Sequence, residues 1–190
     1  MWPLIITSVV SLSVVLERIY FIVSVGMQRQ PEVVEAILTH VERGSVEKAI
    51  EVGSKSGDFV AYALVYGLEH RDRSLSNALL RAANHQLKRF NQGLSVLDTV
   101  ITLAPLLGLL STVTGMIRAF GLLGGQELDA PTVITGGIAE ALIGTAFGLG
   151  IAVVALIPFN YLNARLEEAR HEIEDAATHL ELLLKPSGQP

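Results

Sequence analysis

The sequence contains no cysteine and is poor in charge. The lack of cysteine excludes disulfide bonds, thiolate metal sites and a cysteine nucleophile. Charged residues make up 17% of the 190 residues, against roughly 25% in an average soluble domain. Two stretches, residues 99–117 and 141–164, contain no acidic or basic side chain. These gaps in charge exclude an ordinary soluble domain and indicate segments that cross a bilayer.

The sequence also lacks an excess of positive charge. The net charge is −5 at pH 7 and the isoelectric point is about 5.5, so the chain has no electrostatic basis for binding nucleic acid. The five histidines are scattered through polar segments, and there is no phosphate-binding loop, nucleophile elbow or zinc helix motif. We therefore expect no enzyme activity, no metal site and no cofactor.

Hydrophobic residues, which make up half of the chain, gather in three long segments, residues 1–25, 96–123 and 131–161. A helix rises ~1.5 Å per residue, so about 20 residues cover the hydrocarbon thickness of a bilayer. No Lys or Arg precedes the first segment, unlike in a secretory signal peptide, so we expect it to remain as a spanning helix. The sequence predicts an all-α integral membrane protein with three transmembrane helices.

The distribution of Lys and Arg predicts the orientation of these spans. Residues 26–95 hold nine such side chains and residues 162–190 hold three, whereas residues 124–130 hold none and contain Glu127 and Asp129. Positive charge favours the cytoplasmic side. We therefore expect a cytoplasmic helical domain at 26–95, a short periplasmic loop at 124–130, and a cytoplasmic helix and tail at 162–190. The N-terminus is then periplasmic and the C-terminus cytoplasmic.

Three short helices are predicted within the cytoplasmic domain. The first begins at Pro31 and ends before Gly44, because proline is favoured at helix starts and glycine just past helix ends. A second short helix follows Ser45, and a third covers residues 58–70.

The second and third spans are expected to continue beyond the membrane. Apolar residues alternate at spacings of four and three from Ala83 to Ile101, and again from Leu162 to Leu183, among polar neighbours. This spacing is typical of one continuous helix face. It predicts that both spans extend as long helices into the cytoplasm.

Small residues recur at helical spacing along these two spans. Such rows let helix backbones approach closely in lipid, either within one subunit or between subunits. One pair of helices is expected to bury only some of four rows, which favours an oligomer. The four rows are Ala104, Gly108 and Thr112; Ser111, Gly115 and Ala119; Gly137, Ala141 and Thr145; and Gly144, Gly148 and Ala152.

Polar residues inside the spans are the candidates for function. Glu140 is the only charge of the third span, and a carboxylate at mid-membrane is costly unless it faces protein or water, so a functional role is favoured over an interfacial one. Thr112 and Thr145 either bond to their own helix or line a path. Glu17 and Arg18 point ~100° apart on a helix and are not expected to pair; an anchor at the membrane interface is favoured.

The sequences APLLGLLSTVTGMIRAF (104–120) and GIAEALIGTAFGLGIA (137–152), with LER at 16–18, resemble the MotA/TolQ/ExbB proton channel family. The resemblance covers nearly the whole chain and is strongest to the ExbB branch, with TolQ next. Ser111 stands where the family usually has glycine, and Thr114 where many members have tryptophan.

The resemblance implies a homopentamer in a bacterial inner membrane. The second and third spans would line a pore that holds the single-span helices of an ExbD-like or TolR-like partner dimer, whose aspartate carries protons. Thr112, Thr145 and Glu140 match the family's pore positions. The proton gradient would then do mechanical work on a TonB-like or TolA-like periplasmic protein and drive outer-membrane import.

Other functions remain open. A TolQ-like subunit of the Tol-Pal envelope system is the nearest alternative. A non-conducting membrane scaffold, in which the threonines only pack, is the second. A flagellar-type stator ranks third, because residues 26–95 are few for a rotor-binding domain.

Overall fold

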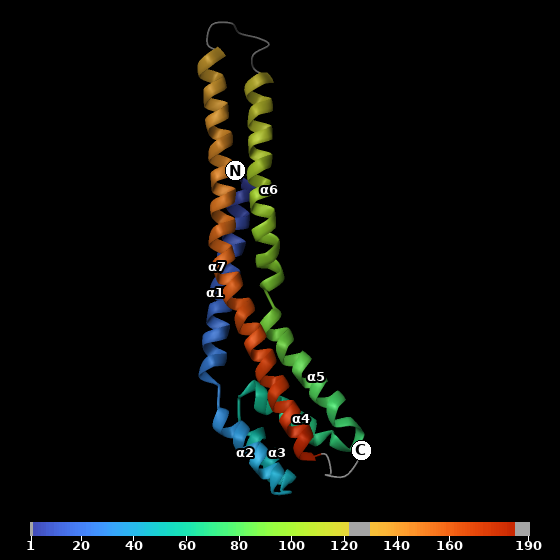
Figure 1. The fold of residues 1–190 in the computed structure, drawn as a ribbon. Helices are drawn as coiled ribbons and strands as arrows, with labels where there is room; N and C mark the ends of the chain where they lie inside the picture. Colours follow the sequence, from blue (N-terminus) through green and yellow to red (C-terminus); the bar gives the residue numbers. More distant parts are fainter. Residues whose placement is uncertain (1, 122–129, 185–190) are drawn as a thin grey trace. The chain divides into compact units, whose positions relative to one another are not determined.

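The computed structural model describes residues 2–121 and 130–184, with side chains from residue 135 onward in the second range. These residues form helices and no strand (Figure 1). Three helical runs are long and apolar enough to cross a membrane, namely Trp2–Met27, Arg71–Gly121 and Thr135–Leu184. The predicted all-α membrane protein with three apolar helices is therefore confirmed. The helices are α1 (Trp2–Met27), α2 (Pro31–Glu42), α3 (Val46–Ser54), α4 (Phe59–Glu69), α5 (Arg71–Asn91), α6 (Leu94–Gly121) and α7 (Ala130–Leu184).

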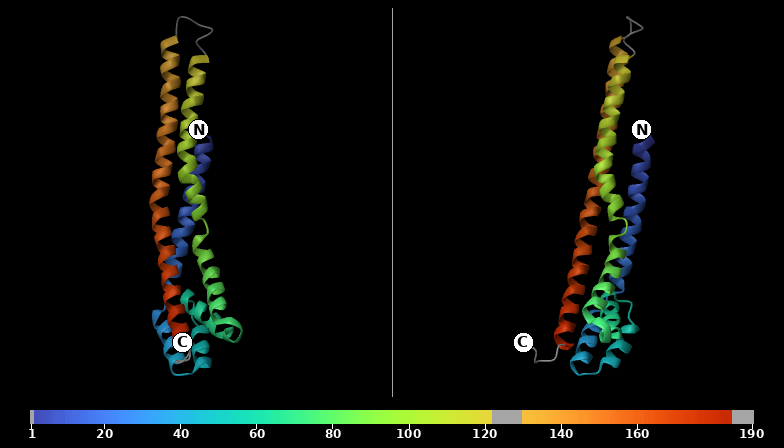
Figure 2. Two further views of the ribbon diagram at one scale, coloured as in Figure 1. Left: turned by 45° about the vertical axis from the view of Figure 1, so that its right-hand side comes forward. Right: turned by 90° about the vertical axis from the view of Figure 1, so that its right-hand side faces the viewer.

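The chain divides into two compact units. Unit 1 comprises residues 1–18 and 93–161, and unit 2 comprises residues 19–92 and 162–190. In unit 1, α6 and the first part of α7 run antiparallel and side by side (Figures 1 and 2). Large apolar side chains on all three helices of unit 1 are exposed, among them Ile6, Leu106, Ile117 and Val154, each at least 61% exposed. Such a surface requires lipid or another protein chain to cover it.

The second span differs from its prediction at the junction of α5 and α6. The apolar spacing from Ala83 to Ile101 predicts one unbroken helix, but α5 ends at Asn91 and α6 begins at Leu94. Gly93 has a φ of +78°, which glycine adopts at little cost and which ends a helix. The spacing of the apolar residues predicts which side chains are buried. It does not predict the backbone conformation of a single residue such as Gly93. α7, in contrast, is one helix of 55 residues.

Unit 2 contains a single apolar core built by α2, α3, α4, α5 and the last part of α7. Its most buried members include Ile37, Leu64, Leu68 and Leu180, all at 0% exposure. α4 is apolar on nearly every side, which suits a central helix covered by its neighbours.

The three short helices of unit 2 form where the sequence predicts them. Pro31 occupies the first turn of α2, and Gly44, with a φ of +73°, follows its end. α3 begins after Ser45. Asp58 caps the start of α4, because its side chain accepts hydrogen bonds from the amides of Val60 and Ala61.

Candidate functional site

The seam between α6 and α7 in unit 1 is lined by small residues. A β-carbon added to Gly108 would lie 3.1 Å from the Cα of Thr145, and one added to Gly148 would lie 2.5 Å from the Ala104 carbonyl oxygen. A side chain at Gly148 would force the two backbones apart, and one at Gly108 would fit only if the facing backbone moved by a few tenths of an ångström. The predicted packing residues are all on this seam, namely Gly108, Ser111, Gly115, Gly137, Ala141, Gly144 and Gly148.

The packing of α6 against α7 within one chain contradicts one argument for an oligomer, namely that one pair of helices would bury only some of the small-residue rows. Each of the four small-residue rows has a buried alanine within a single chain: Ala104 is 0% exposed, Ala119 2%, Ala141 2% and Ala152 8%. One chain therefore buries part of every row, contrary to the expectation that a pair of helices would leave some of them unpacked. The rows by themselves do not require a partner subunit.

Thr112 and Thr145 lie against each other across the seam. The Thr145 hydroxyl donates to the Gly108 carbonyl oxygen at 2.9 Å, and its oxygen lies 3.4 Å from the Thr112 hydroxyl. Thr112 donates to the Leu109 carbonyl of its own helix at 2.6 Å. Both side chains are half-buried. The structure thus brings these two candidates together, with Thr145 bonded across the seam and Thr112 bonded locally.

Glu140 lies apart from the two threonines. It is exposed and lines a pocket of unit 1 together with Ser111, Thr114 and Arg118. Glu140 and Thr145 are five residues apart, which places them ~140° apart around a helix. The three candidates therefore occupy two surfaces, one on each flank of the seam.

Arg118 also lines this pocket, whereas the sequence predicts for it only an anchor at the outer membrane interface. Ser111, Thr114 and Arg118 are spaced three and four apart on α6, so they share one helix face. The same spacing rule that identifies the small-residue rows could have placed Arg118 beside the two hydroxyls. That Arg118 and Glu140 line the same pocket depends on the register of α6 against α7. This register cannot be read from the sequence.

Glu17 and Arg18 form an ion pair, contrary to the prediction from their positions. The Arg18 guanidinium donates to both carboxylate oxygens of Glu17, and Arg18 is 5% exposed. The Cα–Cβ bonds of neighbouring residues do diverge by ~100°, but the long Arg18 chain folds back toward its neighbour. Its aliphatic part lies beside Gly93, where an added β-carbon would be 3.2 Å from Arg18 Cδ.

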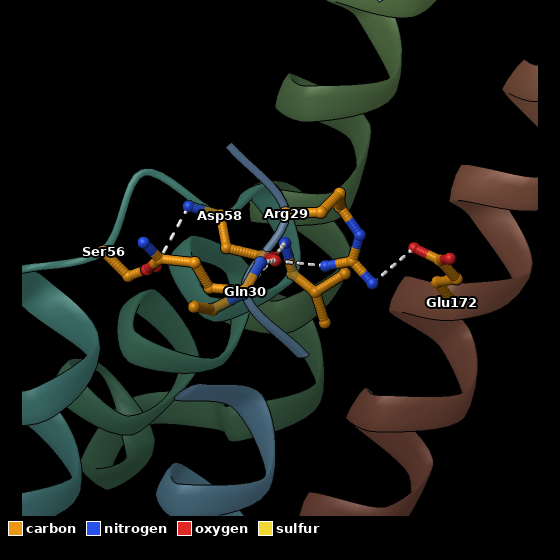
Figure 3. A network of polar contacts seen from close by, with 7 residues as sticks. Arg29, Gln30, Ser56, Asp58 and Glu172 are labelled. Carbon is orange, nitrogen blue, oxygen red and sulfur yellow. Dashed lines mark hydrogen bonds and ion pairs between the residues drawn. The ribbon is translucent and has the colours of Figure 1, made fainter. Parts of the chain in front are cut away.

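A buried carboxylate organises unit 2. Asp58 is 1% exposed; besides capping α4, it accepts hydrogen bonds from the Gln30 amide at 2.7 Å and from the Arg29 guanidinium. Arg29 also reaches Glu172 on α7 at 2.8 Å, while Ser56 donates to the Gln30 side chain at 2.7 Å (Figure 3). The network joins the start of α2, the start of α4 and α7. The cap at Asp58 is readable from the sequence, but its pairing with Arg29 is not.

Burial raises the pKa of Glu172, and the Arg29 charge opposes this effect only in part. Glu172 therefore holds its proton to a higher pH than an exposed glutamate does. Glu127 and Asp129, the acidic residues of the predicted periplasmic loop, lie outside the described residues.

Comparison with known proteins gives one consistent family. A model of the MotA/TolQ/ExbB proton channel family matches residues 54–175. An ExbB-like biopolymer transport protein of Synechocystis sp. is 33% identical over 193 residues, which cover 97% of this chain and 75% of the relative. The TolQ protein of the Tol-Pal system of Haemophilus influenzae is 36% identical over 89 residues, 47% of this chain and 39% of that protein. ExbB of Xanthomonas campestris is 32% identical over 115 residues, 55% of this chain and 44% of that protein.

Proposed function

The chain belongs to the MotA/TolQ/ExbB proton channel family, and from this premise we propose that it is an ExbB-like subunit of a proton-driven motor. In this proposal five copies form a ring in a bacterial inner membrane, with the N-terminus periplasmic and the C-terminus cytoplasmic. The ring encloses a single-span ExbD-like dimer. Protons are the coupling ion, and the work is passed to a TonB-like periplasmic protein that drives outer-membrane import.

The observation that carries the proposal is the hydroxyl pair of Thr112 and Thr145, 3.4 Å apart on the α6–α7 seam. A hydroxyl both donates and accepts hydrogen bonds. Two neighbouring hydroxyls in an apolar wall can therefore bind a carboxylic acid, a carboxylate or a few waters without adding a fixed charge. This is the chemistry needed beside a partner aspartate that gains and loses a proton.

The energetics of the proposal are those of charge moving through the membrane potential. Each elementary charge that crosses 100 mV releases ~2.3 kcal/mol. In this proposal the ionised aspartate draws the Thr112 and Thr145 hydroxyls from the Leu109 and Gly108 carbonyls and accepts their hydrogen bonds. The neutral, protonated aspartate can leave, and the hydroxyls return to these carbonyls. Successive protonation can therefore bias the movement of the partner helices within the ring. Glu140, on the other flank of the seam, is proposed to serve the entry of protons or the contact between subunits.

A non-conducting scaffold is the competing function, and one contact favours it. The Thr145 hydroxyl already donates to the Gly108 carbonyl, so packing alone would account for this side chain. A TolQ-like subunit of an envelope system is the alternative within the family, consistent with the 36% identity to the Haemophilus protein. The two functions within the family share the same test of conduction.

The test removes the hydroxyls and keeps the shape. Thr112→Val and Thr145→Val retain size and β-branching but lose the polar atom. The complex is purified through a tag on this chain from its native membrane, reconstituted into liposomes, and assayed for proton uptake under an imposed potential. Loss of a hydrogen bond on the path is expected to lower the flux by roughly tenfold. The corresponding Thr→Ser variants should keep much of it.

Thr102→Val is the matched control. Thr102 is an exposed threonine of α6 whose hydroxyl donates to the Asp98 and Thr99 carbonyls of its own helix. Thr114 is less suitable, because it lines the pocket that contains Glu140. Parental flux in Thr112→Val and Thr145→Val, at equal assembly, would assign the threonines to packing and support the scaffold.

A further inference from the structure

One surface of unit 2 is strongly basic. α5 carries five Arg or Lys residues and a single acidic residue, Asp72. The buried residues of this helix, such as Leu79 at 3% exposure and Ala82 at 2%, face the core of unit 2. The opposite face exposes Arg81 and Lys88, together with Leu80 at 60% exposure. We call the exposed side chains of Leu80, Arg81 and Lys88 the basic face.

A second surface of unit 2 is acidic. A groove runs between α2 and the last part of α7, with Val34, Leu38 and Leu183 in its lining. Carboxylates accompany this apolar lining, namely Glu35, Glu42, Glu172 and Asp175. We call it the acidic groove.

Most of the acidic charge in the groove is unpaired. The basic groups that face it are Arg29 and His179. Arg29 is engaged by Asp58 and Glu172. No ion pair found among the described residues involves Glu35, Glu42 or Asp175, and the same holds for Arg81 and Lys88 on the basic face.

The two surfaces lie at different edges of the same unit. α4 contacts α5 and also contacts α3 and α2. Figure 1 and the left view of Figure 2 show α5 and α2 on different sides of α4. Each surface combines apolar side chains, exposed at Leu80 and half-buried in the groove, with charge of one sign, and the signs are opposite. Leu80 and its basic neighbours therefore complement the apolar side chains and the carboxylates that line the groove.

We infer that the basic face of one copy of this chain docks into the acidic groove of the next copy. The contact is head to tail, because it joins two different surfaces. A head-to-tail contact closes into a ring when its rotation allows, and every copy then uses both surfaces once. A single external basic peptide would fill the groove but leave the basic face uncovered, so a second copy is the occupant that accounts for both.

This inference rests on the proposed function, because it assumes that the copies form a ring. It adds a contact between unit 2 of one copy and unit 2 of the next.

The experiment uses cross-linking between introduced cysteines. Because the chain has no cysteine of its own, introduced cysteines report this contact without background. A chain carrying Leu80→Cys and Thr39→Cys, in α5 and in the groove, is treated in membranes with a short bismaleimide. We expect a ladder of cross-linked copies, whereas each single variant should give none. Ser54→Cys, exposed on α3, replaces Thr39→Cys in the matched control and should give no ladder.

Charge reversal tests complementarity on the same cross-linking background. Arg81→Glu with Lys88→Glu should lower the yield of cross-linked copies by roughly tenfold at low salt. Adding Glu35→Lys and Asp175→Lys to that chain should restore it. Lys48→Glu with Lys55→Glu, at an exposed residue of α3 and at the exposed residue that follows it, makes the same change in net charge and should leave the yield unaltered.

The outcomes separate this contact from the proposed function. A parent that is pentameric by native mass spectrometry, yet gives no ladder and no rescue, would overturn the docking and leave the channel proposal standing. Cross-links from the groove only to another polypeptide would also overturn it and assign the groove to that polypeptide. A monomeric parent would contradict both proposals.

Discussion

Gly144 faces the Ser111 hydroxyl so closely that a β-carbon added at Gly144 would lie 2.1 Å from the Ser111 oxygen and 2.6 Å from its Cβ. The serine of this chain therefore fits only because the facing residue has no side chain. Any side chain at position 144 would collide with Ser111 unless one of the two positions changed.

Gly144→Ala should consequently weaken the packing of unit 1 by about 1 to 3 kcal/mol, as overpacking of a tight interface does. Ser111→Gly in the same chain should recover most of the loss, because it removes the clashing atoms. Thermal unfolding in mild detergent measures both effects. Gly150→Ala is the control, since nothing lies within 4 Å of a β-carbon at that position of α7; equal losses at both glycines would contradict the steric argument.

The sequence predicts the features of unit 1 that depend on spacing. Four small-residue rows identify the seam, and the separation of Glu140 from Thr145 follows from the helix angle alone. The sequence does not show that Thr145 bonds to Gly108, because this contact depends on how far α7 slides along α6. Gly93 is similar: an added β-carbon there would lie 3.0 Å from a Val14 methyl carbon and 3.2 Å from Arg18 Cδ, and both residues are distant in sequence.

The centre of unit 2 was less predictable for a related reason. The helices and the Asp58 cap follow from local signals near Pro31, Gly44 and Asp58. The pairing of Asp58 with Arg29 joins residues 29 positions apart. No local pattern distinguishes Arg29 from the other basic residues of the segment, so the network required the fold.

Asp58 should be a principal source of stability in unit 2. Asp58→Ala removes the cap of α4 and leaves Arg29 without its buried partner, with an expected loss of about 3 to 5 kcal/mol. Asp58→Asn keeps an oxygen for the cap and loses only the charge, so its loss should be smaller. Chemical denaturation in detergent checks the order. Glu51→Gln, which removes an exposed ion pair with Lys55, should change little; a comparable loss there would contradict the assignment.

Glu172 should make stability fall as the pH rises. Burial raises the pKa of its carboxyl above the ordinary value of 4.5, so the folded state favours the protonated form. The stabilisation is complete below the unfolded pKa and is lost as the pH rises through the folded pKa. Glu172→Gln should therefore gain melting temperature relative to the parent as the pH increases above 4.5.

Glu51 provides the opposite sign in the same experiment. The hydrogen bond from Lys55 holds the pKa of the Glu51 carboxyl below its usual range. Its ionised form is favoured by folding, so this contribution is lost as the pH falls through the folded pKa. Glu51→Gln should not gain relative to the parent at higher pH. Identical pH trends for the two glutamine variants would refute the burial effect at Glu172.

Arg118 and Glu140 should be energetically coupled, because they line one pocket from facing helices of the membrane-spanning unit. Opposite charges attract more strongly there than in water, and either charge left alone is costly. Arg118→Gln and Glu140→Gln should each lower stability, while the double variant should lose less than the sum of the two. A coupling of about 0.5 to 3 kcal/mol is expected from a double-mutant cycle of thermal unfolding. Asp98→Asn, an exposed change near the start of α6, combined with Arg118→Gln, should give additive losses. Additivity of Arg118→Gln and Glu140→Gln as well would show that Glu140 has its partner elsewhere, on a neighbouring subunit or in the pore.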